Sequence, residues 1–194
     1  MLSIELLTRK PILAAMIGSF MIGGLLFGLD TYIPPYIQGV LGTRAAVAGR
    51  VLTPLFLAWA ISVFLAANVV ARLGFRLTSV FGSCLITLGT SGLAVATMFP
   101  DSAKTIFIAS MLVIGFGMGP TSLSQFLSVQ SVVDWSRRGA ATAAVTFFRT
   151  IGGSLCVGIL GASLGLELGM RLKAGGAEGV DVAAALRPET HEKL

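Results

Sequence analysis

Arg149 is a charged side chain in the middle of an apolar stretch at residues 139–166. In a helix it would lie roughly 15 Å from the start of that stretch, near the middle of a bilayer. A charge at this depth is costly and normally faces protein or water. Two interpretations are open. Arg149 is either a cation that binds an anionic group or tunes a carboxylate used in proton coupling, or a structural arginine bonded to helix carbonyls.

Two other polar residues are candidates for the same pathway. Gln125 lies about 12 Å from residue 133 along the apolar stretch at residues 105–133, so its depth resembles that of Arg149. Asp30 directly follows another apolar stretch and lies roughly 27 Å from residue 12 along a helix, near the outer surface. An interfacial role is favoured for Asp30, and a direct pair with Arg149 is not expected.

These side chains must be positioned by membrane helices, because the composition leaves little surface for water. Of the 194 residues, 55% are hydrophobic and 12% charged, and the mean hydropathy is +0.88. Soluble proteins carry about 25% charged residues, and disordered chains are poor in hydrophobic residues. The net charge of +5 does not indicate a nucleic-acid partner, because the basic residues are scattered and form no stripe.

Five apolar stretches are near or above the roughly 20 residues that a helix needs to cross a bilayer. They are residues 12–29, 51–71, 77–99, 105–133 and 139–166. The fold predicted is therefore an all-α membrane protein with five transmembrane helices. The predicted segments are an N-terminal cytoplasmic segment at residues 1–11, the five-helix bundle at residues 12–166 and a polar extracytoplasmic tail at residues 167–194.

Basic residues set the predicted orientation. Those at the N-terminus and in two loops fall on one side of the membrane: Arg9, Lys10, Arg72, Arg76, Arg137 and Arg138. The short loops of the other side hold fewer: Arg44, Arg50 and Lys104. Because cytoplasmic loops carry an excess of Lys and Arg, the N-terminus is predicted to be cytoplasmic, in a multi-pass protein of the plasma or inner membrane.

Small residues and prolines mark candidate packing faces and hinges. Pairs of glycines four residues apart allow helix backbones to approach closely. They are Gly24 with Gly28, Gly115 with Gly119 and Gly161 with Gly165, and Gly152 and Gly153 add to the last stretch. The favoured interpretation is that these glycines serve ordinary close packing of helices. The alternative is that the glycine-rich helix faces move against each other during transport. Pro34 and Pro35 should bend or end the first helix, as an outer hinge or a helix terminus, and Pro120 should kink the fourth.

No arrangement of residues indicates catalysis or a metal site. Cys84 and Cys156 lie in separate apolar stretches, and the single histidine, His191, lies in the polar tail. There is no Ser-His-Asp arrangement, no pair of carboxylates and no phosphate-binding glycine loop before a lysine. The chain is therefore predicted not to be an enzyme, and to use no cofactor and no metal.

The segment at residues 67–76 resembles the signature loop of the major facilitator superfamily, G-x-L-x-D-R-x-G-R-R. Arg72, Gly74 and Arg76 match this conformational loop. Ala71 stands where the family has an acidic residue that contributes to a charge-based cytoplasmic latch. The segment at residues 34–42 is similar to the connection between the first two helices of the family's C-terminal half.

Further motifs extend the resemblance over nearly the whole chain. The segments at residues 115–120, 138–141 and 148–153 are similar to the fourth and fifth helices of that half. The order of the motifs is closest to the fourteen-helix drug:proton antiporter branch.

The resemblance implies a partial half-bundle, because the family's C-terminal half has six helices and five are predicted here. The chain is then expected to be a fragment, a truncated reading frame or part of a split transporter. Its expected partners are the bilayer, a small-molecule substrate, the missing N-terminal half and the last helix. The implied function is proton-coupled efflux of drugs or other small molecules by alternating access. The alternative is a non-transporting membrane scaffold or partner-binding subunit.

Overall fold

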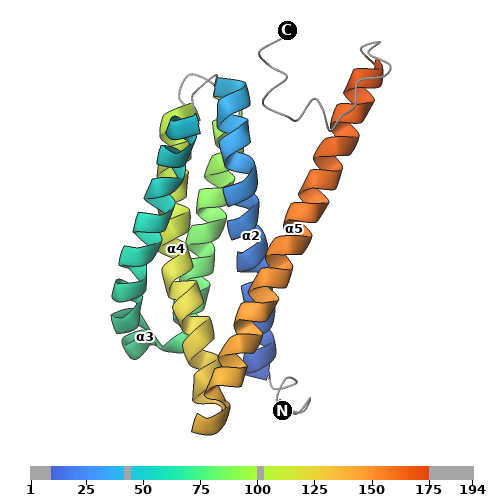
Figure 1. The fold of residues 1–194 in the computed structure, drawn as a ribbon. Coiled ribbons are helices and arrows are strands. Elements are labelled where there is room, and N and C mark those ends of the chain that lie inside the picture. Colours follow the sequence, from blue (N-terminus) through green and yellow to red (C-terminus); the bar gives the residue numbers. More distant parts are fainter. Residues whose placement is uncertain (1–9, 42–44, 100–102, 175–194) are drawn as a thin grey trace.

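The protein is all-helical over the residues that the computed structural model describes, which are 10–41, 45–99 and 103–174. Its elements are α2 (Lys10–Leu41), α3 (Ala45–Ala96), α4 (Ala103–Ser131), the short η2 (Trp135–Arg137) and α5 (Arg138–Ala174). Figure 1 shows the long helices side by side, with α5 inclined to the rest. Four helices are long and apolar enough to cross a membrane. The predicted class of multi-pass α-helical membrane protein is therefore confirmed.

Helix α3 folds back on itself at Gly74. A straight helix of 52 residues would be about 78 Å long, more than twice the thickness of the hydrocarbon core. Gly74 has φ 76° and ψ 170°, a conformation that is open to glycine and not to other residues. It separates a first arm (residues 45–73) from a second arm (residues 75–96), as Figure 1 shows. The stretches predicted at residues 51–71 and 77–99 thus lie in the two arms of one helical element.

Helix α4 packs between the two arms. Later residues of the first arm contact later residues of α4, so these two segments are parallel. Later residues of the second arm contact earlier residues of α4, so these two segments are antiparallel. The two arms therefore run in opposite directions along α4. The contacts are Leu55 with Gly115, Ser62 with Gly119, Gly82 with Thr121 and Gly89 with Ile114.

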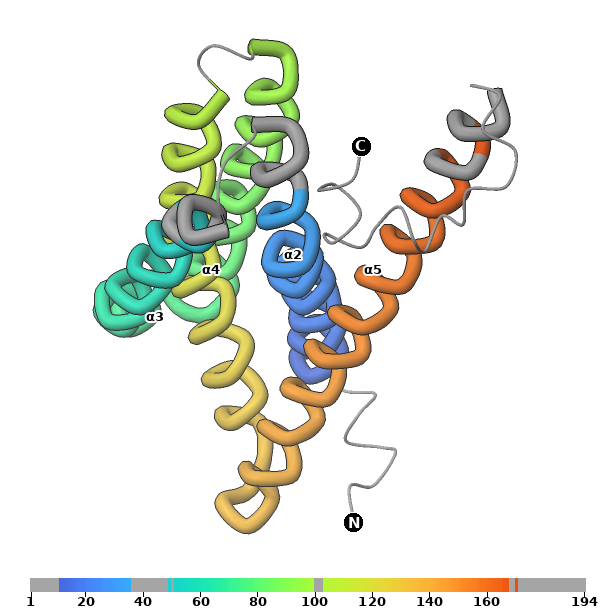
Figure 2. The backbone as a smooth tube through the Cα atoms, turned by 45° about the horizontal axis from the view of Figure 1, so that its top comes forward, coloured from blue at the N-terminus to red at the C-terminus, as the bar shows by residue number. Residues whose placement is uncertain are grey.

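Helices α2 and α5 form a second, parallel pair. They cross where glycines on both helices leave room for the backbone of the other, and both ribbon views show α5 leaving the bundle beyond this crossing (Figure 2). The contacts along the pair are Phe20 with Gly152, Gly23 with Arg149, Gly24 with Cys156 and Gly28 with Leu160. The position of α5 is thus set mainly by α2.

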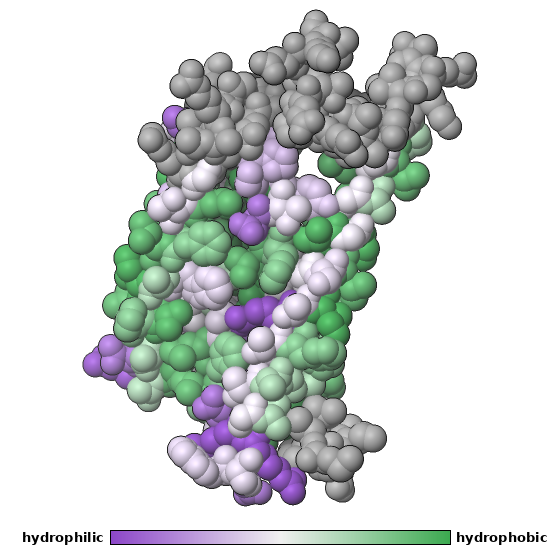
Figure 3. Space-filling view, viewed as in Figure 1, coloured by the Kyte–Doolittle hydropathy of each residue, from purple (hydrophilic) through white to green (hydrophobic). Residues whose placement is uncertain are grey.

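The predicted basic side of the protein lies at one end of the bundle. The start of α2, the fold-back of α3 and the connection from α4 to α5 meet there (Figure 1). This basic end comprises Lys10, Arg72, Arg76, Arg137 and Arg138. Figure 3 shows hydrophilic side chains gathered at this end, below a broad apolar belt. The bundle therefore has the surface expected of a protein that lies in a bilayer.

Two helices extend beyond their predicted ends. Helix α2 continues through Pro34 and Pro35 to Leu41, so the interpretation of this pair as a helix terminus is wrong. The prolines lack N–H groups and leave the carbonyls of Asp30 and Thr31 without their usual helical donors, which membrane helices tolerate. Helix α5 continues to Ala174, beyond the predicted boundary at residue 166, and residues 175–194 lie outside the described residues.

Candidate functional site

Arg149 lies half-buried on α5 against the middle of α4. Its Nη2 donates a hydrogen bond to the Ser122 hydroxyl, with 3.3 Å between the two atoms. The guanidinium carbon lies 5.2 Å from the centre of the Phe126 ring. Ser122 and Phe126 are four residues apart and thus neighbours on one face of α4. The Nε atom of Arg149 is buried and has no hydrogen-bond partner among the described residues.

The crossing of α2 and α5 holds Arg149 in this place. Gly23 lies directly against the main-chain carbonyl of Arg149, and a Cβ at that position would overlap it. One turn along α5, Gly152 lies in the same way against the carbonyl of Phe20. Small residues at such crossings let membrane helices approach until their backbones touch. The backbone at Arg149 is therefore fixed relative to α2 while its side chain reaches α4.

Gln125 joins α4 to α2 at almost the same level. The Ser19 hydroxyl donates to its Oε1, with 2.7 Å between the oxygens, and both residues are buried. Gly18 leaves the space that the Gln125 amide occupies. The two polar contacts, Ser19 with Gln125 and Ser122 with Arg149, join α2, α4 and α5 in the apolar interior. Counting along the helices placed Gln125 level with Arg149, but the structure gives each of them a different partner.

No carboxylate balances the Arg149 charge within the described part of the chain. Asp30 is exposed near the far end of α2. Gly23 is level with Arg149, and seven more residues place Asp30 roughly 10 Å further along α2. A guanidinium has five N–H donors in a planar fork, and the described contacts of Arg149 use one of them. The arrangement can therefore bind a further acceptor, above all an oxyanion.

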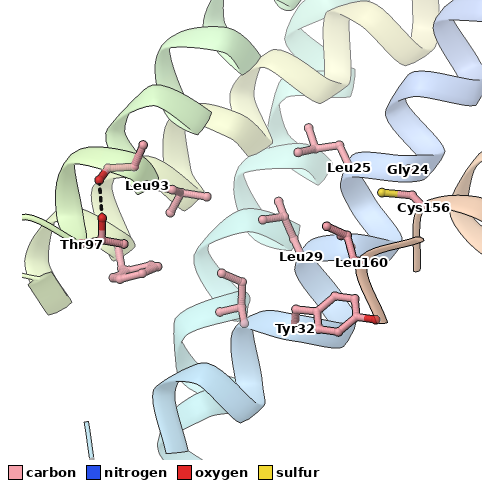
Figure 4. A pocket seen from close by; sticks show the side chains of 12 residues that line it. Gly24, Leu25, Leu29, Tyr32, Leu93, Thr97, Cys156 and Leu160 are labelled. Carbon is pink, nitrogen blue, oxygen red and sulfur yellow. Dashed lines mark hydrogen bonds between the residues drawn. The ribbon is translucent and has the colours of Figure 1, made fainter. Parts of the chain in front are cut away.

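A separate apolar pocket lies between α2, α5, the second arm of α3 and the start of α4, toward the end opposite the basic one. It has a volume of about 450 Å³. Its few polar groups are used within the protein: the Tyr32 hydroxyl donates to the carbonyl of Val157, and the Thr97 hydroxyl to that of Ala94. Figure 4 shows leucines from α2, α5 and the second arm directed into it. The lining residues are Gly24, Leu25, Gly28, Leu29, Tyr32, Ile33, Leu93, Ala94, Thr97, Phe107, Cys156 and Leu160.

The other residues predicted for the site lie away from both places. Arg72 and Arg76 are exposed on either side of Gly74, at the fold-back of α3. Gly115 and Gly119 are buried against the first arm, and α4 continues through Pro120 to Ser131. Gly153 packs against the Phe27 ring. The described residues include no group of three or more His, Cys, Asp or Glu that could hold a metal ion.

Sequence reasoning did not single out Ser19, Ser122 or Gly23 as site residues. Ser122 carries a signal in hindsight, because it lies three residues before Gln125 and hence one turn away on a similar face. Gly23 directly precedes the predicted pair Gly24 and Gly28. Nothing in the sequence alone could show that Gly23 would meet the backbone of Arg149.

Known transporters match most of this chain. It is 29% identical over 154 residues to the Multidrug transporter protein MdtP of Bacillus subtilis (strain 168). These aligned residues are 79% of this chain and 28% of that protein. Multidrug resistance protein 3 of the same strain is 28% identical over 147 residues, with 76% of this chain and 28% of that protein covered.

A fungal relative extends the match. The Rubrofusarin-specific efflux pump aurT of Gibberella zeae (strain PH-1) is 27% identical over 165 residues, covering 85% of this chain and 30% of that protein. The chain thus spans about three tenths of the length of these relatives. The model of the Major Facilitator Superfamily matches residues 2–157. Together with the helical bundle, this match shows that the chain belongs to the Major Facilitator Superfamily.

Proposed function

We propose that this chain is part of a transporter that exports drugs or other small molecules from the cell. Membership of the Major Facilitator Superfamily and the names of the multidrug and efflux relatives support this assignment. The observation that carries it is Arg149, a charge held in the apolar interior with spare hydrogen-bond donors. Such intramembrane charges commonly mark substrate or ion pathways.

Within this proposal Arg149 lies on the pathway near the middle of the membrane, the buried Gln125 lies behind it between α4 and α2, and Asp30 lies at its outer mouth. The chain crosses the membrane five times, because each arm of α3 makes one crossing. The basic end then faces the cytoplasm together with the N-terminus, in the plasma or inner membrane, in line with the excess of Lys and Arg there. Coupling of export to protons is part of the proposal and rests on the resemblance to the antiporter branch.

Further helices complete the carrier in this proposal. On the side of α5 that does not face α2, and beyond the crossing, large apolar side chains are exposed, among them Leu155, Ile159 and Leu166. The first arm of α3 forms a parallel pair with α4, and the second arm packs against this pair. Helix α2 forms a similar parallel pair with α5, and the apolar pocket lies beside that pair. A further helix packed there would fill the pocket, and a second bundle facing Arg149 would enclose the substrate between two halves.

Export from cells that make the protein tests the proposal. Cells with and without the gene are loaded with a panel of cationic, neutral and anionic fluorescent dyes, and the rate of dye loss is measured. Slower loss of at least one dye, restored by returning the gene, is expected. Unchanged loss of every dye, together with stable co-purification of another membrane protein, would favour the scaffold alternative.

The purified chain reconstituted alone in proteoliposomes is expected not to transport. The reason is that the described helices enclose Arg149 from the side of α4 and α2 only, so no second bundle is present to alternate access. Dye efflux driven by an imposed proton gradient is the measurement. Efflux at a rate typical of complete carriers would contradict the need for further helices.

A further inference from the structure

Most polar groups of the bundle interior are paired, and among the described residues the Ser124 hydroxyl and Arg149 are exceptions. Ser62 donates to the carbonyl of Gly115 at 3.1 Å, and Thr121 to that of Gly117 at 2.8 Å. Ser19 and Gln125 satisfy each other at 2.7 Å. Arg149, which carries a full charge, has one long bond to a neutral hydroxyl and a buried Nε without a partner. Burying a charge without a counter-charge is costly. The surroundings of Arg149 therefore lack an anion that would balance its charge.

The neighbours of Arg149 define how that anion approaches. The guanidinium carbon lies over the Phe126 ring, 5.2 Å from its centre, a distance typical of a cation–π contact. Ser122 occupies one Nη atom. An additional ligand is therefore received on the edge of the guanidinium plane, where the remaining N–H groups point.

Ser122 supplies a second donor at the same edge. Its oxygen accepts from Arg149, and the hydroxyl hydrogen has no acceptor within the described part of the chain. A planar guanidinium matches the two oxygens of a carboxylate, and such bidentate contacts are short and strong. In an apolar surrounding the attraction is larger than in water. Carboxylate is thus the oxyanion that this edge fits best.

We propose that Arg149, assisted by Ser122 and Phe126, selects apolar molecules that carry a carboxylate over neutral molecules of the same shape. This inference rests on the proposed export function and names the substrate class of its site. The carboxylate binds the guanidinium edge, and the apolar body of the molecule lies against Phe126 and the apolar walls of the bundle.

Binding to the purified chain tests the inference without relying on transport. The matched probes are 1-pyrenebutyrate and 1-pyrenebutanol, which share an apolar body and differ in the carboxylate. Their affinities for the 194-residue chain in lipid nanodiscs are measured by equilibrium dialysis, with empty nanodiscs as background. Charged hydrogen bonds predict that the carboxylate binds about tenfold or more tightly than the alcohol.

Variants of the arginine identify the source of that preference. Arg149→Gln should reduce the ratio of the two affinities to about one, and Arg149→Lys should retain part of it, because lysine keeps the charge but loses the fork. Arg137→Gln is the matched control, since it removes the same charge from an exposed position at the basic end. A ratio unchanged by Arg149→Gln, or lowered equally by Arg137→Gln, would overturn the inference.

Export of the same probes separates this inference from the proposed function. In cells, Arg149→Gln should slow export of the carboxylate several-fold while export of the alcohol continues. Equal loss of both exports would overturn selection by Arg149, and is the result expected if an acidic side chain of another helix pairs with it. Export of neither probe by the unmodified protein would count against the export proposal, and the binding ratio would still decide the inference.

Discussion

Substituting Gly23 by alanine should separate α2 from α5 at their crossing. A Cβ at Gly23 would lie 2.7 Å from the carbonyl carbon of Arg149, whereas ordinary van der Waals contact begins at 3.4 Å. The obstructing atoms belong to the backbone and cannot rotate away. The two helices must therefore move apart by at least about 0.7 Å at the place that positions Arg149.

The expected cost follows from overpacking in an otherwise close-packed interior. Such substitutions destabilise proteins by about 1–3 kcal/mol. Alanine also favours the helix over glycine, by up to about 1 kcal/mol. Gly158→Ala on α5 is the matched control, because a Cβ there meets no atom within 4 Å and only the gain in helix stability applies. The difference between the two variants should thus be about 1–3 kcal/mol.

The two cysteines of the described helices provide the assay. Cys156 is partly buried beside Gly24 at the crossing, and Cys84 on the second arm of α3 is exposed and serves as an internal reference. The rate at which N-ethylmaleimide labels each thiol in the detergent-solubilised protein is followed by mass spectrometry. If labelling of Cys156 requires local opening, a difference of 1–3 kcal/mol corresponds to roughly 5- to 150-fold faster labelling.

The labelling rates of Cys156 in the two variants show whether α2 and α5 are in contact at Gly23. Gly23→Ala should accelerate the labelling of Cys156 relative to Gly158→Ala, while the rate for Cys84 stays the same in both. Equal rates for Cys156 in the two variants would show that α2 and α5 do not touch at Gly23. The account of how Arg149 is positioned would then be wrong.

Two further substitutions test other contacts through the free energy of unfolding in mixed detergent titrations. Gln125→Leu should lower that free energy by on the order of 1–3 kcal/mol, because it leaves the buried Ser19 hydroxyl without its partner. Adding Ser19→Ala to this variant should recover part of the loss, because no unpaired hydroxyl then remains. Gly74→Ala should lower it by about 1–3 kcal/mol, because φ 76° with ψ 170° strains any residue with a Cβ, although no neighbouring atom obstructs one. No loss in Gly74→Ala would contradict the fold-back conformation of α3.

The helical class of the protein could be predicted from the length of its uncharged stretches. A bilayer requires every backbone group to be paired within the segment that crosses it, so long apolar runs leave few alternatives to helices. The break at Gly74 lies between Arg72 and Arg76, in the loop predicted to join the second and third apolar stretches. The end of α2 could not be predicted, because prolines that would end a helix in water are tolerated in membrane helices.

The positions of the site residues along their helices could be estimated, but their partners could not. Counting residues gives the position of a side chain along its helix at about 1.5 Å per residue. It gives no information on which face meets which neighbour, since this depends on how the helices cross. Gln125 and Arg149 were expected at similar levels, and Arg149 contacts Ser122 and Phe126 on either side of Gln125 along α4. The contacts with Ser19 and Ser122 emerged only from the structure.

The most direct test of the account is the export rate of cells that carry Arg149→Ala. It is compared with the unmodified protein and with Arg137→Ala at equal abundance in the membrane, using a carboxylate-bearing dye whose loss depends on the gene. The account predicts that Arg149→Ala lowers the export rate by about tenfold or more, as expected when a charged hydrogen-bonding group is removed from a pathway, and that Arg137→Ala leaves it nearly unchanged. Unchanged export by Arg149→Ala would contradict the placement of this arginine in the transport pathway.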